Sequence, residues 1–235
     1  MTIEQRVRRL PWREIEESLW RFGFAKTAPV LTPQECAGLV GLYADASRFR
    51  SRIEMERYRF GVGDYQYFAN PLPDAVQELR AHAYPFLAPI ANRWMEALGI
   101  PEDYPAELSD LAARCRKQGQ SKPTPLLLHY EAGGYNCLHQ DIYGELVFPF
   151  QIVCFLSRPD RDYTGGEFLL VEQRPRAQSI GEAIRGEQGE MVVFTTRYRP
   201  VKGSRGYYRA NIRHGVSRVR SGTRYTLGII FHDAK

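Results

Sequence analysis

The amino-acid sequence predicts an α+β fold with a double-stranded β-helix (jelly roll) core and N-terminal helices packed on one of its sheets. Up to about residue 120, apolar residues recur mainly at helical spacing. From Thr124 onward, eight short strand-like segments are separated by glycine, proline and charged turns, which is typical of an antiparallel jelly roll. A hydrophobic content of 43%, with 12% aromatic residues, is sufficient for a buried core.

Four helices are expected in the N-terminal half. They are predicted at Pro11 to Phe22, from Thr32 to about Ala46, from Pro73 to Leu98 and from Pro105 to Lys117. Thr32 is followed three residues later by Glu35, which is the pattern of a capping box. Pro85 and Pro89 each remove an internal hydrogen bond, so the third helix is expected in two pieces or with a kink.

Between these helices, residues 49–68 (FRSRIEMERYRFGVGDYQYF) alternate basic and aromatic side chains around a glycine turn, which predicts a hairpin or lid. Residues two apart share one face of a strand, so Arg50 pairs with Arg52 and Tyr65 with Tyr67. These four residues are candidates for substrate recognition, because rings can stack on bases while guanidinium groups pair with phosphates. The alternative, which we favour, is an edge hairpin whose rings pack inward while its arginines face water.

The eight predicted strands follow in order. They are TPLLLHYE, NCLHQD, FPFQIVCFLS, GEFLLVEQ, RAQSI, GEMVVFTT, YRANIRHGV and RYTLGIIFHD. Gly165 and Gly166 precede the fourth strand and Gly189 the sixth, at turn positions that need the conformational freedom of glycine.

No linker, internal repeat or low-complexity segment divides the chain, so residues 1–235 are expected to form a single domain. Residues 1–120 would be mainly helical support, with the hairpin or lid near 49–68, and residues 121–235 the jelly-roll core. No apolar run reaches the ~18–20 residues that cross a bilayer, and the N-terminus lacks the apolar stretch of a signal peptide. We therefore expect a cytoplasmic protein with no membrane partner; nothing in the sequence indicates its oligomeric state.

The charge balance permits a polyanionic partner. The chain has 32 Lys and Arg against 27 Asp and Glu, a formal net charge of +5, and such an excess can attract nucleic acid through phosphate contacts without requiring it. The four cysteines are scattered with no C-x-x-C pair, which argues against a zinc cluster or a disulfide framework. We expect reduced packing residues at Cys36, Cys115, Cys137 and Cys154.

The strongest chemical signal is a set of three metal-binding residue types. His139 and Asp141 are two apart in an extended segment, so an imidazole nitrogen and a carboxylate oxygen can point to one place while Gln140 turns away. His214, in another strand-like run, is a sensible third ligand. Two histidines and one carboxylate form a facial triad that suits iron(II) and leaves three coordination positions open.

A second signal lies ten residues after His214. Arg224 and Thr226 are two apart at the start of an apolar run, so a guanidinium group and a hydroxyl share one face. Together they can hold one carboxylate, with the arginine binding in a two-pronged manner. The sequence therefore predicts a carboxylate site near the metal.

This arrangement resembles the iron(II)- and 2-oxoglutarate-dependent oxygenases, and from about Leu10 to Asp233 the chain is similar to the bacterial Oxygenase-NA group. The similarity lies in PLPDAV with APIANRW, PTPLLLHYEAGGYNCLHQDIYGE, TGGEFLLVEQRPR and RANIRHGVSRVRSGTRYTLGIIFHD. The resemblance implies a dioxygenase that uses Fe(II), 2-oxoglutarate and O2, with Arg224 and Thr226 on the distal carboxylate. It also suggests that Tyr130 helps to hold 2-oxoglutarate, although a plain core role fits equally well. Asn136 and Gln151 could contact the same molecule, but structural hydrogen bonding is favoured for both.

Three functions remain open. The group's label and the basic hairpin favour hydroxylation of alkylated nucleic acid, which would release the adduct as an aldehyde. The spacing between His214 and Arg224 instead resembles that of prolyl hydroxylases, so a protein hydroxylase that acts on a ribosomal or other basic protein is the alternative. A non-catalytic jelly-roll binding module is the alternative from a different class, and it would not need both the triad and the carboxylate site.

Overall fold

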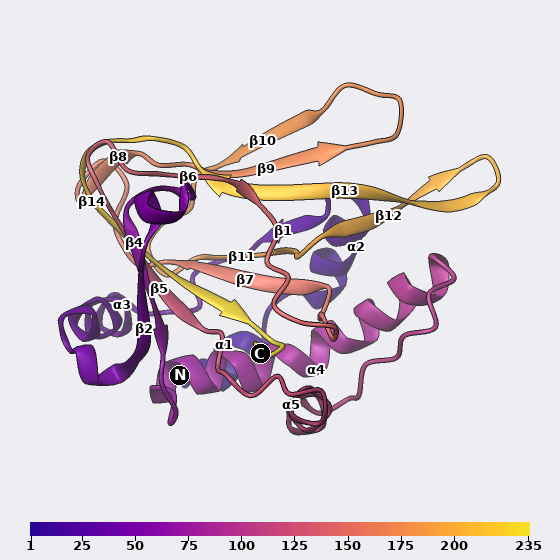
Figure 1. Ribbon diagram of the computed structural model, residues 1–235, viewed down its shortest axis with the longest axis horizontal. Coiled ribbons are helices and arrows are strands. Elements are labelled where there is room, and N and C mark those ends of the chain that lie inside the picture. The colour runs from indigo at the N-terminus through magenta and orange to yellow at the C-terminus, as the bar shows by residue number, and fades with distance from the viewer.

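Two antiparallel sheets that enclose an apolar interior dominate the computed structural model, which describes residues 1–235 (Figure 1). The larger sheet has the order β1-β11-β7-β14-β5-β4-β2, with β8 also pairing with β14, and the smaller has the order β10-β9-β13-β6-β3, with β12 pairing with β13. The strands of the larger sheet are β1 (Phe24–Lys26), β2 (Phe49–Glu54), β4 (Asp64–Phe68), β5 (Leu126–Glu131), β7 (Phe150–Phe155), β8 (Tyr163–Gly165), β11 (Met191–Thr195) and β14 (Val219–Ile230). Those of the smaller are β3 (Gly61–Val62), β6 (Tyr135–His139), β9 (Phe168–Gln173), β10 (Ile180–Ile184), β12 (Tyr198–Gly203) and β13 (Gly206–Val216).

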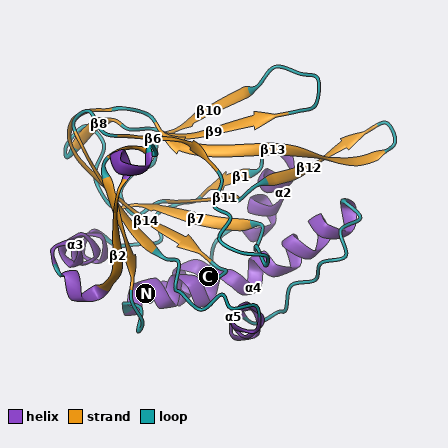
Figure 2. Ribbon diagram, viewed as in Figure 1, coloured by secondary structure: helices purple, strands orange, loops and turns teal.

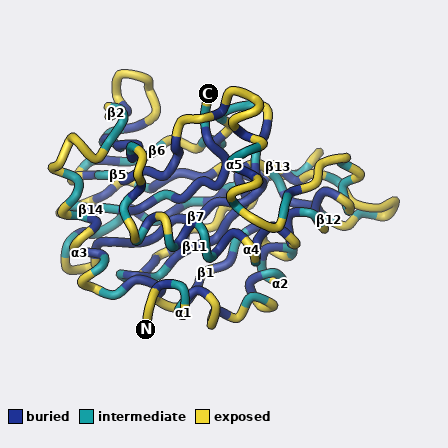
Figure 3. Tube along the Cα trace, turned by 90° about the horizontal axis from the view of Figure 1, so that it is seen from below, coloured by how far each residue is buried: buried dark blue, intermediate teal, exposed yellow.

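The helices lie on the outer face of the larger sheet, as expected from the sequence (Figure 2). They are α1 (Ile3–Arg8), α2 (Trp12–Phe22), α3 (Pro33–Gly41), α4 (Asp74–Ala97) and α5 (Leu108–Lys117). A cluster of 37 buried apolar residues joins these helices to the larger sheet. The burial view shows the central strands as a mostly buried band and the turns as exposed (Figure 3). No helix combines the length and the apolar character that a membrane span needs.

Local sequence explains several helix boundaries. Thr32 and Glu35 form the expected capping box, in which each side chain accepts a hydrogen bond from the other residue's backbone N–H group. Gly23 ends α2 in the left-handed conformation with φ of 80°. The segment Pro73 to Leu98 forms one helix rather than two pieces, because α4 contains both Pro85 and Pro89. Its buried face packs against the larger sheet, and this tertiary packing outweighs the two lost hydrogen bonds.

The predicted hairpin of residues 49–68 forms, but both of its strands join the larger sheet. Strand β4 pairs with β5 as well as with β2, so β2 is the sheet edge. The turn between them contains a short 3-10 helix, η3 (Met55–Tyr58), and the small strand β3. The hairpin is therefore an extension of the core, and only the turn projects from it (Figure 1).

The eight predicted strands are all present, most with boundaries shifted by a few residues, and four further strands, including the two-residue β3, were not predicted. The segment RAQSI becomes a strand only at its last residue, where β10 begins. The short strands β1 and β8 were not predicted, and neither was β12, which contains Pro200. Pro200 has no N–H group to donate, but β12 pairs with β13 alone, and an edge position tolerates proline.

Candidate metal and cosubstrate site

Three side chains from the predicted triad meet at one end of the space between the sheets. One ligand atom from each of His139, Asp141 and His214 lies within 4.8 Å of the other two. The two imidazole rings are 4.2 Å apart between centroids, and Asp141 Oδ2 is 3.1 Å from His214 Nε2. Two nitrogens and one carboxylate oxygen at this spacing can serve as three ligands of a single metal ion.

The smaller sheet positions both histidines. Strands β13 and β6 pair so that His214 lies directly opposite His139. The Nδ1 atom of His139 is 2.8 Å from the carbonyl oxygen of Cys137 and donates to it, so Nε2 is left free to bind a metal. Gln140 points away from the cluster, as expected, and its amide donates to the carbonyl oxygens of Arg197 and Ile212. These two hydrogen bonds hold the loop that carries Asp141.

Asp141 is held by a tyrosine that the sequence analysis did not identify. The hydroxyl of Tyr143 donates to Asp141 Oδ1 over 2.5 Å, while Oδ2 faces His214. The two carboxylate oxygens therefore have different partners: Oδ1 accepts from Tyr143 and lies 3.5 Å from His139 Nε2, whereas Oδ2 accepts no tyrosine hydrogen bond and is the freer ligand for a metal. Tyr67 in turn donates to the hydroxyl of Tyr143 over 3.1 Å. An alternating reading of residues 139–143 would have placed Tyr143 on the face of Asp141.

The electrostatics of the cluster favour the protonation states that bind metal. Burial alone would raise the pKa of Asp141, but the neighbouring His214 and His139 and the hydrogen bond from Tyr143 together lower it below its usual value. Burial and the neighbouring His139 lower the pKa of His214 despite the opposing effect of Asp141. An ionised carboxylate and a neutral imidazole are the forms in which these residues coordinate a cation.

A cavity of about 360 Å³ extends from this cluster along the inner face of the larger sheet, and Arg224 and Thr226 line it. Arg224 is 1% exposed, and its Nε and Nη2 atoms have no hydrogen-bond partner. Its only hydrogen bond is a long one of 3.5 Å from Nη1 to the hydroxyl of Thr226. A buried guanidinium group with two free donors is costly unless an anion occupies the cavity, so the site fits a carboxylate.

The surroundings of Arg224 are shaped to hold its side chain in place. Gly166 has φ of 65°, and a Cβ atom there would lie 2.8 Å from the Cδ atom of Arg224. Aromatic rings surround the guanidinium carbon, with the ring of Tyr130 5.5 Å away and that of Tyr163 5.8 Å away. The glycine turn predicted from the sequence therefore also makes room for the carboxylate-binding side chain.

Of the three other predicted cosubstrate contacts, two line the cavity and one is buried behind the lining residues. Asn136 and Gln151 line the cavity, and the Nε2 atom of Gln151 is buried without a partner. Tyr130 is fully buried and is not among the lining residues; its hydroxyl accepts a hydrogen bond from Asn136. Tyr130 thus contacts Arg224 and Asn136 rather than the cavity itself.

The four predicted substrate residues do not all lie on one face of the hairpin. Tyr65 and Tyr67 share the inner face of β4 and line the cavity. The predicted shared face for Arg50 and Arg52 is wrong, because the pairing register shifts between Phe49 and Ser51. Arg52 forms an ion pair with Asp64 on the face opposite the cavity, with its Nε atom 2.9 Å from the carboxylate.

Arg50 stays near Tyr67, with its guanidinium carbon 4.4 Å from the ring centroid. Its Nε atom donates to the carbonyl oxygen of Pro123, so this arginine is engaged within the protein. Cys137 also differs from expectation: it is exposed and lines the cavity, whereas Cys36, Cys115 and Cys154 are buried. Its position two residues before His139, on the same face of the strand, was the signal that Cys137 could lie near the metal, although a packing role was favoured.

Comparison with known proteins agrees with this geometry. A family model named Oxygenase-NA, described as "Oxygenase, catalysing oxidative methylation of damaged DNA", matches residues 63–234. An uncharacterised protein of Mycobacterium tuberculosis is 53% identical over 167 residues, which is 71% of this chain and 72% of that protein.

Solved structures share the fold at low sequence identity. A prolyl-4-hydroxylase of Pseudomonas putida superposes with a TM-score of 0.57 at 15% identity, covering 95% of this chain and 99% of that one. A 2OG-Fe(II) oxygenase family oxidoreductase of Burkholderia pseudomallei gives a TM-score of 0.54 at 15% identity, covering 95% and 92%. These likenesses concern the fold, which is the jelly roll that the sequence predicted.

Proposed function

The chain belongs to the Oxygenase-NA family, and we propose that this oxygenase is an Fe(II)- and 2-oxoglutarate-dependent dioxygenase that hydroxylates alkyl groups on nucleic acid. The observation that carries the proposal is the buried Arg224, whose two free donors face the cavity that also contains the triad. A metal-binding jelly roll without a cosubstrate would have no need of this arginine.

His139, Asp141 and His214 would hold iron(II) on one face of its coordination sphere. When bound, the iron supplies the activation of O2, which no side chain in the cavity can perform. Tyr143 keeps Asp141 Oδ1 occupied, so that the carboxylate presents one oxygen to the metal. The two sheets shield His214 and Asp141 from bulk water, since both residues are less than a tenth exposed.

Arg224 and Thr226 would bind the distal carboxylate of 2-oxoglutarate, and this orients its other end toward the triad. Gln151, with its free amide, lies on β7 directly opposite Phe194, whose ring is 4.9 Å from His214. The amide is thus placed to donate to the oxygen atoms of the cosubstrate near the metal. These contacts fix the orientation of the cosubstrate before the substrate arrives.

The proposed reaction consumes one O2 for each substrate alkyl group. One oxygen atom enters 2-oxoglutarate, which loses CO2 and becomes succinate. The other is inserted into the C–H bond of an N-alkyl group, and the resulting hydroxyalkyl group leaves as an aldehyde, so a methyl group is released as formaldehyde. The family description and the net charge of +5 support nucleic acid as the substrate.

A protein hydroxylase is the second candidate. The spacing of ten residues between His214 and Arg224 and the fold shared with the Pseudomonas putida prolyl-4-hydroxylase favour it. A cavity that ends at a carboxylate-binding arginine suits either substrate, so the rim of the cavity is the feature that separates them.

The test is cosubstrate turnover with defined substrates. Purified protein loaded with Fe(II) is given 2-oxoglutarate and either an oligonucleotide containing an N-methylated adenine, its unmethylated form, or protein from a cell extract. We expect the methylated oligonucleotide to stimulate succinate formation and to release formaldehyde in equal amount. Stimulation by the protein fraction alone would establish the second candidate, and no turnover of any kind would favour a binding module.

A further inference from the structure

Exposed apolar side chains are concentrated at the mouth of the cavity. Eight large hydrophobic residues in the chain are exposed, and four of them lie at this mouth: Tyr58 (53% exposed), Phe60 (47%), Leu138 (41%) and Ile142 (43%). Phe60 and Leu138 line the cavity itself, and Ile142 directly follows the lining residue Asp141. An exposed apolar rim around a cavity marks a surface that binds something.

The mouth loop, defined as residues 55–60, carries the two aromatic members of this rim as a preformed stack. The rings of Tyr58 and Phe60 lie 5.5 Å apart between centroids at an interplanar angle of 21°. Met55 anchors the loop, because its side chain is fully buried against a cluster that includes Tyr130. Phe60 closes it, since its N–H group donates to the carbonyl oxygen of Met55 and its carbonyl oxygen accepts from Cys137.

Two arginines alternate with these rings, and both are free. Arg57 and Arg59 form no ion pair and no side-chain hydrogen bond, and both are exposed. The arginines earlier in the same hairpin have partners: Arg48 pairs with Asp45, Arg50 donates to a backbone carbonyl group and Arg52 pairs with Asp64. Glu56, on the same loop, forms no ion pair with either free arginine.

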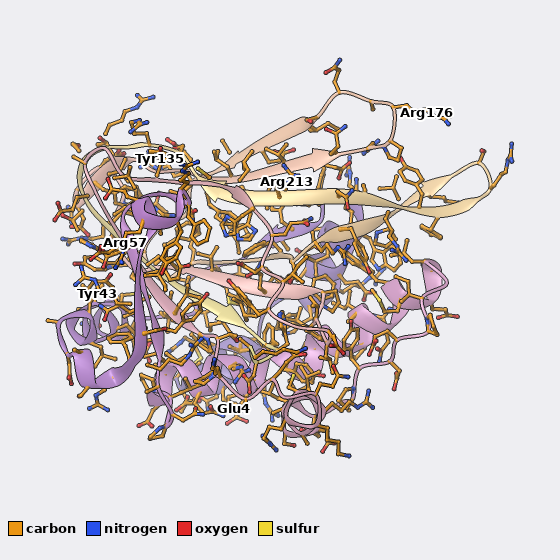
Figure 4. The ribbon with its side chains drawn as sticks, viewed as in Figure 1. Glu4, Tyr43, Arg57, Tyr135, Arg176 and Arg213 are labelled. Atoms are coloured by element: carbon orange, nitrogen blue, oxygen red, sulfur yellow. The ribbon has the colours of Figure 1, made fainter.

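The loop's surroundings extend this pattern. Val62, just after the loop, pairs with Tyr135 on β6, and the guanidinium carbon of Arg218 lies 4.5 Å from the Tyr135 ring centroid. Arg57 and Tyr135 lie at the same end of the molecule, whereas Arg176 lies on the β9–β10 hairpin at the other end (Figure 4). Cationic groups interleaved with exposed rings form a surface that suits a flexible polyanion with flat bases.

We propose that the mouth loop is the nucleotide-binding element of this enzyme: Tyr58 and Phe60 stack on bases next to the target base, while Arg57 and Arg59 bind the adjoining phosphates. The inference rests on the proposed function and adds a substrate form to it. The triad lies between the sheets, and a base within a duplex cannot reach it. The substrate is therefore a single strand or an extrahelical nucleotide.

A peptide is a poorer match for this rim. Arg57 and Arg59, which are exposed and unpaired, would repel the basic protein of the second candidate, whereas the phosphates of a nucleic acid would attract them. Leu138 and Ile142 provide the apolar contact that the target base needs as it enters the cavity. This surface replaces Arg50 and Arg52, which are engaged within the protein, as the recognition element.

Binding of a fluorescein-labelled single-stranded oligothymidylate, measured by anisotropy over a salt series, tests the proposal. Tyr58→Ala and Phe60→Ala should each weaken binding about five- to tenfold, since one base loses a stacking partner. Arg57→Gln and Arg59→Gln should each lower the slope of log affinity against log salt by about 0.7, the value for one lost phosphate contact on a single strand. Phe60→Tyr, which keeps the ring, should bind like the unmodified protein.

Two exposed residues outside the mouth are matched controls. Tyr207, 44% exposed on β13, controls for removal of a surface ring. Arg176 has the same φ of 60° as Arg59 and no ion pair, so Arg176→Gln controls for the backbone as well as the charge. Neither control variant should change the affinity or the salt slope.

The outcomes distinguish failure of the mouth loop as the nucleotide site from failure of nucleic acid as the substrate. If methylated oligonucleotides stimulate turnover but the four loop variants bind like the controls, the mouth loop is not the nucleotide site and the proposed function stands. If the unmodified protein binds no oligonucleotide and only a peptide stimulates turnover, both the nucleotide site and the nucleic-acid substrate are excluded. A methylated duplex that is processed faster than the same single strand would overturn the proposed substrate form.

Discussion

At the scale of single residues, the site depends on side chains that hold other side chains. The metal ligands and the carboxylate-binding arginine follow short patterns, H-x-D and R-x-T, and these are visible in the sequence because strand geometry brings alternate residues to one face. The supporting residues are harder to predict. Tyr143 follows the same alternation, but its partnership with Asp141 depends on a loop whose path is set by Gln140.

Removing the Tyr143 hydroxyl should weaken iron binding. Tyr143→Phe leaves Asp141 Oδ1 without its hydrogen bond, so the carboxylate can rotate, and we expect about 10- to 100-fold lower Fe(II) affinity. Anaerobic Fe(II) titration measures the effect. Tyr104→Phe is the control, because Tyr104 also donates one hydrogen bond, to Val147, away from the metal. Equal iron affinity in both variants would show that Tyr143 does not position Asp141.

Removing the charge of Arg224 should weaken binding of 2-oxoglutarate and leave the affinity for Fe(II) unchanged. Arg224→Gln removes a charge-assisted hydrogen-bonding group with two free donors, so the KM for 2-oxoglutarate should rise about 10- to 100-fold. Fe(II) affinity in the absence of cosubstrate should stay within about twofold, because Arg224 is not a ligand. An unchanged KM would place the cosubstrate elsewhere, and Arg205→Gln, an exposed change on the turn between β12 and β13, controls for net charge.

At the scale of elements, the central strands of the sheets were predicted more completely than the edge strands. Central strands such as β7 are continuous apolar runs and stand out in the sequence. Edge strands such as β12 carry proline and charged residues and resemble loops. The outward face of the β2 edge was also mispredicted, because the register shift near Arg50 depends on pairing with β4 rather than on local sequence.

A buried ion pair joins the edge strand β12 and the inner strand β9 to the helices. Arg199 on β12 pairs with Glu172 on β9 over 2.6 Å, and its Nη1 atom also donates to the carbonyl oxygen of Trp20 in α2. Both side chains are at most a tenth exposed. The pair therefore links β9, β12 and α2.

Breaking this pair from one side should be costly. Glu172→Gln leaves Arg199 charged and buried, so the free energy of unfolding should fall by about 3–5 kcal/mol. The double variant Glu172→Leu with Arg199→Met removes both buried charges. Arg174, which also pairs with Glu172, is more than a third exposed and can be solvated, so the double variant should recover most of that loss. Denaturant unfolding measures both. A double variant less stable than the single one would mean that the ion pair itself, rather than the unpaired charge, determines stability at this position.

At the scale of the whole molecule, the fold class was predictable and the continuity of the helical layer was not. The jelly roll with helices on one sheet follows from the change in pattern near residue 124. The unbroken α4 does not, because its two prolines are tolerated only through packing against the larger sheet. That layer and the C-terminal segment also bury His232 completely, with its Nδ1 atom accepting from the N–H group of Phe148.

This burial should make stability depend on pH. Burial lowers the pKa of His232 to about 4. Since the value in the unfolded chain is about 6.5, protonation favours the unfolded state, and stability is lost as the pH falls from about 6.5 toward 4. The contribution of this group is up to about 3 kcal/mol. His232→Asn keeps an acceptor for Phe148 but does not titrate, so its unfolding free energy should fall less over that range; an identical fall would contradict the account.

The most direct test of the central claim is an anaerobic titration of the protein with Fe(II) and then 2-oxoglutarate, followed by visible absorption. If the triad and Arg224 form one site, the two additions together should produce a weak metal-to-ligand charge-transfer band, absent with either alone. Asp141→Ala should abolish the band, and Arg224→Gln should shift its appearance to higher 2-oxoglutarate concentration. A band of full intensity in Asp141→Ala, or none in the unmodified protein, would contradict the account.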